Sequence, residues 1–109
     1  LYYIGWNSST DPDWALRPIY QSTNCPPVLA NEGYYVNKDV DRMLDEALTI
    51  QDDAKRAAMY DKIQETVWND APWAWLVFED NTAASNKKLK EFNPMPDSSF
   101  DFYNAYWEE

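Results

Sequence analysis

The apolar positions of residues 38–49 recur at helical spacing. They lie three or four residues apart, so they share one face of a helix. These positions are Val40, Met43, Leu44, Ala47 and Leu48. Asn37 precedes the first turn and suits an N-cap. The pattern predicts an amphipathic helix, on whose polar face Arg42 and Glu46 are spaced to form an ion pair.

A second helical stripe follows after a short polar link. Its apolar members are Met59, Tyr60, Ile63 and Val67. They predict a helix over about 53–69 that is capped by Asp52. The helix is expected to end before Pro72, which biases the preceding residue away from helical backbone. The two helices should form a hairpin. Four apolar residues should be buried between these helices and a sheet: Leu44, Leu48, Ile63 and Val67.

The flanking segments have the character of strands and loops. Residues 1–6 are apolar and aromatic and are bounded by turn formers, which predicts a buried strand. Residues 73–80 predict another strand, and the alternation over 100–107 predicts a last one. Residues 22–36 and 93–100 contain prolines and predict loops.

A short helix is predicted between the opening strand and the helical hairpin. Asp11 suits its N-cap, Pro12 its first position, and Asp13 adds negative charge near the positive end of the helix. Pro18 would lose a backbone hydrogen bond there, so the helix should be short or kinked. The order strand, short helix, helical hairpin, strands predicts an α/β fold class.

Composition excludes several classes of function. The chain has 19 acidic and 9 basic residues, and its formal net charge of −10 argues against nucleic acid as a partner. Histidine is absent, and we find no nucleophile motif, so we predict no catalytic residues and no metal site. No stripe suggests a cofactor. The lone Cys25 cannot form an internal disulfide.

The turn that leads into the short helix gathers groups suited to ligand binding. The candidates are Trp6, Ser8, Ser9, Thr10, Asp11 and Arg17. Hydroxyls and backbone amides can meet a peptide's polar groups, Asp11 can accept from an ammonium, and Arg17 can pair with a carboxylate. Open α/β sheets bind ligands at this kind of position, at the carboxyl ends of strands. The same residues can instead serve as core, helix cap and surface ion pair, and their spacing leaves both interpretations open.

Several segments together resemble a known family over nearly the whole chain. They read "GW", "DPDWALRPIY", "GYYVNKDVDRMLDEALTIQDDAKRAAMYDKIQETVWNDAPWAWLVFED", "KKLKEF" and "MPDSSFDFYNAYW". In this order they are similar to the C-terminal end of ABC-transporter solute-binding proteins of the peptide/nickel type, the extracellular solute-binding family five. The R-x-x-x-Y helix and the "DAPW" break contribute to the match. "DWALRP", the "VW" before the break and "MPDSSFDF" are most similar to the glutathione-binding branch.

The resemblance implies a longer parent chain that forms a two-lobed periplasmic-binding-protein fold. Such a receptor closes over a small peptide, such as glutathione or a dipeptide, and delivers it to the membrane permease of an ABC importer. Residues 1–99 would form part of the C-terminal lobe, and residues 100–109 a tail crossing toward the N-terminal lobe. The chain itself begins within an apolar run, so we expect it to be a segment. The implied location is periplasmic, or extracellular on a membrane-anchored lipoprotein in a Gram-positive organism.

One departure from the family bears on the ligand. Dipeptide and oligopeptide relatives place an aspartate three residues after the GW tryptophan, where it holds the ligand's α-amino group. Here that position is Ser9, and the next acid is Asp11. This difference favours a ligand with another arrangement at its amino end, such as a γ-linked peptide.

Two other functions stay open on the residues alone. A stand-alone aromatic module could bind carbohydrate or protein through Trp73 and Trp75. A hydrolase fragment could use a pair of neighbouring carboxylates, Asp11 with Asp13 or Glu79 with Asp80. A receptor closes on its ligand without turnover, whereas a hydrolase releases product, and we expect a protein that is not an enzyme.

Overall fold

The computed structural model describes residues 5–6, 10–77, 80, 82–95 and 98–109. The chain divides into two compact units, which are described separately. The helical unit is Asp11–Trp75, and the sheet unit comprises Leu1–Thr10 and Leu76–Glu109. The described residues combine helices with small sheets, the mixed α and β content that the pattern predicts.

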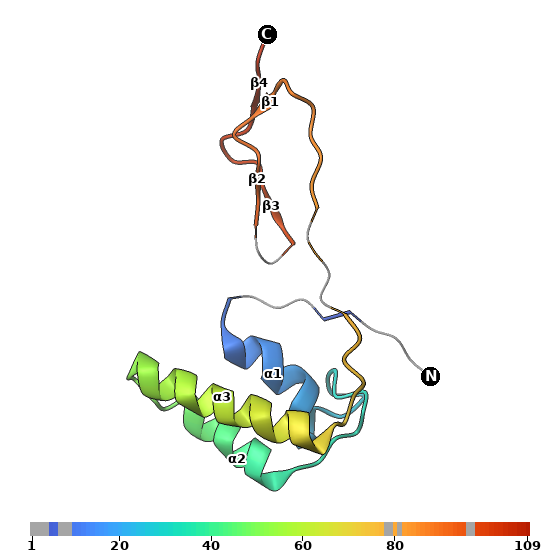
Figure 1. The fold of residues 1–109 in the computed structure, drawn as a ribbon, viewed down its shortest axis with the longest axis vertical. Helices are drawn as coiled ribbons and strands as arrows, with labels where there is room; N and C mark the ends of the chain where they lie inside the picture. Colours follow the sequence, from blue (N-terminus) through green and yellow to red (C-terminus); the bar gives the residue numbers. More distant parts are fainter. Residues whose placement is uncertain (1–4, 7–9, 78–79, 81, 96–97) are drawn as a thin grey trace. The chain divides into compact units, whose positions relative to one another are not determined.

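Three α-helices build the helical unit (Figure 1). They are α1 (Pro12–Tyr20), α2 (Lys38–Ala47) and α3 (Asp53–Asp70), and a single 3-10 turn, η1 (Ser22–Asn24), follows α1. Helices α2 and α3 form the predicted hairpin, and α1 packs against both of them. Among the described helices, none combines the length and apolar character that crossing a bilayer requires.

Side-chain caps set where the three helices begin. The carboxylates of Asp11 and Asp52 accept from backbone N–H groups of α1 and α3, and the Asn37 amide oxygen does so for α2. All three predicted caps are therefore confirmed. Helix α3 ends at Asp70, where Ala71 adopts a left-handed conformation with φ of 45° directly before the proline. Pro18 lies inside α1, which is short as expected and ends two residues later.

The core of the helical unit is formed by side chains from all three helices. The buried apolar residues are Ile19, Tyr20, Val40, Met43, Leu44, Ala47, Tyr60, Ile63 and Val67. Met59 is only partly buried. Within this unit, α1 covers one side of the α2–α3 hairpin.

Leu48 was predicted to be buried, and that prediction was wrong. Its side chain is 56% exposed, because α2 ends at Ala47 and Leu48 is already the C-cap. It comes eight positions after Val40, which carries it about 80° around the helix to the edge of the buried stripe.

The predicted loop over 22–36 is confirmed, and a buried asparagine organises it. Asn31 is fully buried, and its Nδ2 donates to the carbonyl oxygens of Gln21 (3.1 Å) and Tyr35 (2.8 Å). Its Oδ1 accepts from the Tyr35 N–H at 2.9 Å. The side chain thus satisfies backbone groups that the loop cannot pair by itself.

The described residues of the sheet unit form four strands of two residues each. They are β1 (Leu89–Lys90), β2 (Asn93–Pro94), β3 (Phe100–Asp101) and β4 (Tyr106–Trp107). Strands β1 and β4 pair antiparallel, as do β2 and β3, so each sheet has two strands (Figure 1).

The strand predictions agree with the structure less closely than the helix predictions do. Residues 73–77 and 80 form no strand, and the expected strand over 100–107 is interrupted by a turn between β3 and β4. The expected loop over 93–100 instead carries the paired strands β2 and β3 at its ends. Residues 1–4 of the opening strand lie outside the described residues, and Gly5 and Trp6 are not in a strand. Apolar alternation makes a strand only where another strand offers hydrogen bonds, and most of these segments have no such neighbour among the described residues.

Candidate functional site

The predicted ligand-binding turn is divided between the two units. Trp6 and Thr10 belong to the sheet unit, whereas Asp11 and Arg17 belong to the helical unit. Ser8 and Ser9 lie outside the described residues.

The sheet-unit half consists of Trp6 and Thr10. Thr10 is exposed and Trp6 is partly buried. The indole Nε1 of Trp6 is shielded from solvent and has no hydrogen-bond partner among the described residues. A shielded indole N–H without an acceptor is unfavourable, so this group is suited to an acceptor from outside the described residues.

Asp11 is at once a helix cap and a partner of α3. Its Oδ1 accepts from the backbone N–H of Asp13 at 2.8 Å. The Arg56 Nη2 donates to both carboxylate oxygens, each at 3.0 Å. The hydrogen bond from Arg56 and that from the Asp13 N–H lower the pKa of Asp11, so this half-exposed carboxylate is anionic at neutral pH.

Arg17 joins α1 to α2. Its Nε donates to Asp13 Oδ2 at 2.8 Å, its Nη1 to Asp45 Oδ1 at 2.8 Å, and its Nη2 to the carbonyl oxygen of Leu44 at 2.6 Å. The side chain is only 18% exposed. Burial opposes its charge, but the hydrogen bonds that Arg17 donates to Asp13 and Asp45 outweigh burial and raise the pKa of Arg17. A ligand carboxylate would share this guanidinium with partners already present.

Two residues that contact this turn were missed by the sequence reasoning as members of the site. The hydroxyl of Tyr60 donates to Asp13 Oδ1 at 3.1 Å and accepts from Arg56 Nη2 at 3.3 Å. The guanidinium carbon of Arg56 lies 5.0 Å from the centroid of the Tyr60 ring. Burial and the neighbouring Asp13 raise the pKa of Tyr60, so its hydroxyl stays protonated. Their spacing of four puts both side chains on one face of α3, but it does not indicate that this face meets α1.

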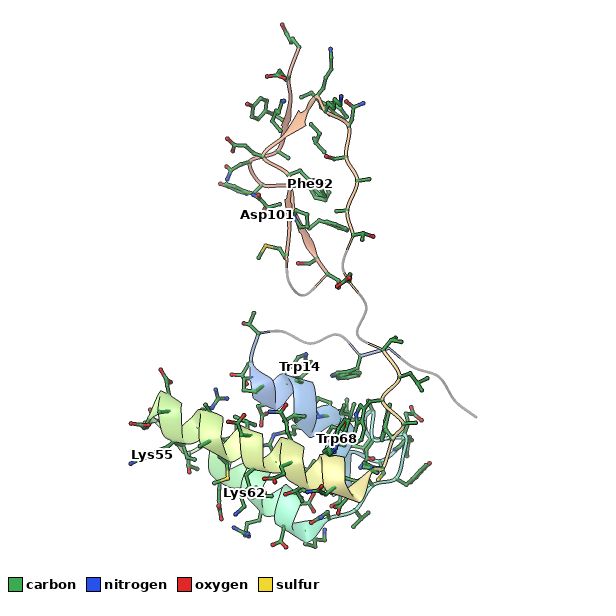
Figure 2. The ribbon with its side chains drawn as sticks, in the orientation of Figure 1. Trp14, Lys55, Lys62, Trp68, Phe92 and Asp101 are labelled. Atoms are coloured by element: carbon green, nitrogen blue, oxygen red, sulfur yellow. The ribbon has the colours of Figure 1, made fainter. Side chains whose placement is uncertain are left out.

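The aromatic residues of the alternative function are largely engaged within the helical unit. Trp73 is partly buried, contacts Tyr20 edge-on with ring centroids 6.4 Å apart, and lies so close to Gly33 that a Cβ there would be 2.8 Å from its Nε1. Trp75 stacks on Trp68 with centroids 4.8 Å apart. Trp68 lies near the C-terminal end of α3, away from Lys55 at its start (Figure 2). This arrangement argues against Trp73 as a sugar platform.

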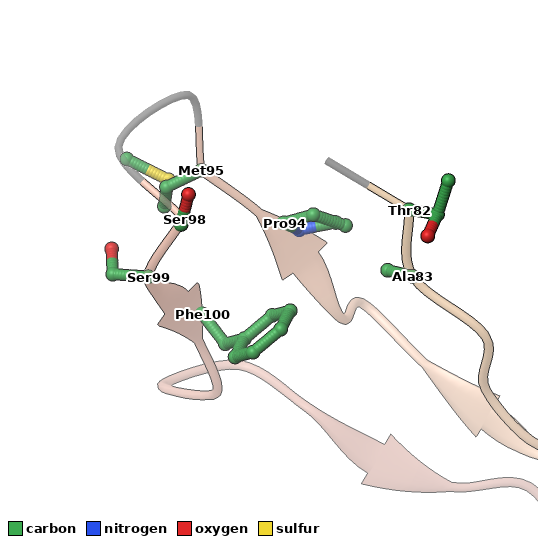
Figure 3. A pocket seen from close by; sticks show the side chains of 7 residues that line it. All are labelled: Thr82, Ala83, Pro94, Met95, Ser98, Ser99 and Phe100. Atoms are coloured by element: carbon green, nitrogen blue, oxygen red, sulfur yellow. The ribbon is translucent and has the colours of Figure 1, made fainter. Parts of the chain in front are cut away.

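A small hollow lies among the described residues of the sheet unit. It is lined by Thr82, Ala83, Pro94, Met95, Ser98, Ser99 and Phe100 (Figure 3). Its volume of about 80 Å³ is well below the roughly 300–1,000 Å³ of pockets that enclose small ligands. In the part of the chain that the structure describes, no group of acidic or cysteine side chains is arranged to hold a metal ion.

Comparison with known proteins finds relatives that are named as glutathione-binding proteins. No family model matches it. It is 42% identical over 106 residues to the glutathione-binding protein GsiB of Shigella dysenteriae serotype 1 (strain Sd197). The resemblance to the glutathione-binding branch is therefore confirmed. The glutathione-binding proteins GsiB of Escherichia coli (strain K12) and Shigella flexneri match with the same identity and length.

The match covers nearly all of this chain but only a small part of each relative. It takes in 96% of this chain but only 21% of each GsiB relative. The chain thus spans about a fifth of the length of the glutathione-binding proteins that it matches. This proportion agrees with the expectation that the sequence is a segment of a longer protein.

Proposed function

We propose that the chain is a segment of the solute-binding component of an ABC importer for small peptides such as glutathione. The observation that carries the proposal is the 42% identity to glutathione-binding proteins over 96% of the chain. The parent protein would be a receptor without catalytic activity, with a peptide as ligand and a membrane permease as partner. We place it in the periplasm, with residues 1–99 in the C-terminal lobe and residues 100–109 in a tail toward the N-terminal lobe.

The ligand-binding residues of the proposal lie on the turn into α1. Trp6 would cover an apolar part of the ligand, and Ser8, Ser9 and Thr10 would supply hydroxyls and backbone N–H groups. Asp11 supports the proposal because it is anionic and half exposed, so it can accept from a ligand ammonium. Arg17 would contribute positive charge toward a ligand carboxylate, in addition to joining α1 to α2.

The first test is ligand binding by the full-length protein that contains this chain. Isothermal calorimetry should give saturable binding of glutathione, and chromatography should recover the ligand unchanged. Because the aspartate that dipeptide relatives use is replaced by Ser9, glutathione should bind more tightly than its α-linked isomer. Equal affinity for both isomers would contradict a preference for the γ-linked form, and no binding of either would contradict the function.

The second test assigns Asp11 to the ligand ammonium. Asp11→Asn should weaken glutathione binding about five- to tenfold. The loss should be smaller than for a fully buried carboxylate, because the Asp11 side chain is half exposed. The loss should disappear with N-acetylglutathione, which carries no ammonium. Asp39→Asn, which alters an exposed acid on α2, is the matched control and should bind normally. An equal loss with both ligands would show that Asp11 acts as scaffold only.

The third test separates the two roles of Arg17. Arg17→Ala should lower the melting temperature, because Asp13, Asp45 and the Leu44 carbonyl lose their donor. If Arg17 also meets a ligand carboxylate, the variant should lose more affinity for glutathione than for its C-terminal amide. An identical loss for the two ligands would remove Arg17 from the site.

A further inference from the structure

An arginine and a tyrosine of α3 make polar contacts with the start of α1. Arg56 and Tyr60 are one helical turn apart on α3. Arg56 reaches Asp11, the N-cap of α1, and Tyr60 reaches Asp13 in its first turn. Arg56 is 45 residues from Asp11, and Tyr60 is 47 residues from Asp13. These contacts therefore join α1 and α3, which are far apart in the sequence.

Tyr60 is the buried and therefore least mobile member of this group of residues. Its ring belongs to the buried core of the helical unit, and only 2% of the residue is exposed. Its hydroxyl is the polar end of a buried side chain, and it both donates to Asp13 and accepts from Arg56. Because a buried aromatic side chain has little freedom, the hydroxyl defines where its partners lie.

Arg56 connects the Tyr60 hydroxyl to the carboxylate of Asp11. Its guanidinium lies over the Tyr60 ring, and its Nη2 is within 3.3 Å of the Tyr60 hydroxyl and 3.0 Å of both Asp11 oxygens. The ring and the hydroxyl together restrict the side chain to one arrangement, which a lone surface arginine would not have. Arg42 is a useful contrast, since its ion-pair partners among the described residues are Asp39 and Glu46 of its own helix.

We propose that Arg56, held by Tyr60, is the positioning residue of the ligand-binding turn. It fixes the carboxylate of Asp11 at the point where the turn enters α1, so that Asp11 meets a ligand ammonium without first having to be ordered. Arg56 itself contacts no ligand. This inference rests on the proposed function, and it gives a physical role to the R-x-x-x-Y spacing of α3.

The test compares Arg56→Gln with two companion variants in the full-length protein. Arg56→Gln should weaken glutathione binding by about threefold to tenfold, because Asp11 loses its orientation. Its melting temperature without ligand should shift by less than about 2 °C, because an ion pair with a half-exposed carboxylate contributes little to stability. Arg56→Lys should recover most of the affinity, since it keeps a donor toward Asp11. Arg42→Gln, the matched control, should bind as the unaltered protein does.

A double variant shows whether Arg56 acts through Asp11. In Asp11→Asn/Arg56→Gln, the affinity should be no lower than in the weaker-binding single variant, because both changes remove the same positioned carboxylate. Tyr60→Phe keeps the ring and removes only the hydroxyl, so it should reproduce part of the Arg56→Gln loss.

Each outcome decides the inference. Unchanged affinity in Arg56→Gln, or losses that multiply in the double variant, would overturn it. A large fall in melting temperature without rescue by lysine would also overturn it, because Arg56 would then be a stabilising residue only. Normal binding by Arg56→Gln with weakened binding by Asp11→Asn would refute this inference and leave the proposed function intact. Absence of peptide binding by the unaltered protein would refute both.

Discussion

The helical unit and the sheet unit differ in how they bury their apolar residues. Nine apolar side chains of the helical unit are buried, whereas no described residue of the sheet unit is buried as a whole. The sheet unit does have an aromatic cluster, in which Phe92 lies 5.4 Å from Phe100 and 5.3 Å from Phe102 between ring centroids. Phe100 and Phe102 nevertheless remain 52% and 58% exposed.

The difference follows from what each kind of element needs. Helices α2 and α3 satisfy their own backbone groups, and their apolar stripes meet directly across the hairpin. Two-residue strands pair only with each other and offer too little surface to cover an aromatic cluster. Phe92 and Asp101, labelled in Figure 2, lie in this sparsely paired region. The helical unit thus has its own core, whereas the described residues of the sheet unit do not form one.

The largest expected effect is a difference in unfolding free energy between a core mutation in the helical unit and an aromatic mutation in the sheet unit. Leu44 is completely buried, so Leu44→Ala should lower the free energy of unfolding by about 2–5 kcal/mol. Phe100→Ala in the same 109-residue chain should cost less than about 1 kcal/mol, because half of that ring is already exposed. Denaturant unfolding followed by circular dichroism measures both. Similar costs for the two variants would break the comparison.

A smaller effect is expected where the helical unit relies on a buried polar group. Asn31→Ala should cost about 1–3 kcal/mol, because two carbonyl oxygens and one backbone N–H lose their partner inside the unit. Asn86→Ala is the matched control in the sheet unit, since its side chain accepts one hydrogen bond at an exposed site. Equal melting temperatures of the two variants would count against Asn31 as the organiser of its loop.

These two residues also mark what the sequence could and could not predict. Helix positions and caps followed from local spacing, because Asn37 and Asp52 act within one turn of their own helices. Asn31 was not singled out, since its partners Gln21 and Tyr35 are defined only once the loop has folded around it. Strand predictions failed for the related reason that residues 73–77 lack a described partner strand.

The candidate site shows the same limit. Asp11 as N-cap could be predicted from its place before Pro12, because a cap is local. The contact between Asp11 and Arg56 could not, because 45 residues separate them. Helical spacing placed Tyr60 in the core, but not its hydroxyl against Asp13.

The smallest expected effect is acid sensitivity of the helical unit. Burial by itself would raise the pKa of Asp41, but hydrogen bonds from Ser22 and Lys38 outweigh it and hold the pKa below the ordinary value of 3.8. A carboxyl whose pKa is lowered by folding stabilises the folded state above its unfolded pKa, and that contribution is lost as the pH falls through the folded pKa. Stability should therefore decline below about pH 4.

Asp41→Asn tests this assignment. The variant should unfold more easily at pH 7 but should lose less additional stability between pH 7 and pH 3 than the unaltered chain does. Urea unfolding midpoints at the two pH values provide the measurement. Glu108→Gln, which removes an exposed carboxylate of the sheet unit, should leave the pH dependence unchanged. An identical pH dependence in Asp41→Asn and the unaltered chain would contradict the assignment.

The proposed function depends most on where a ligand touches this chain, and hydrogen exchange of the full-length protein measures that directly. Exchange would be followed by mass spectrometry with and without glutathione, in peptides that cover residues 5–17 and residues 38–70. Our account predicts that glutathione slows exchange in the turn into α1 and leaves the core-facing parts of α2 and α3 unchanged. Slower exchange in the helical hairpin with none in residues 5–17 would contradict it.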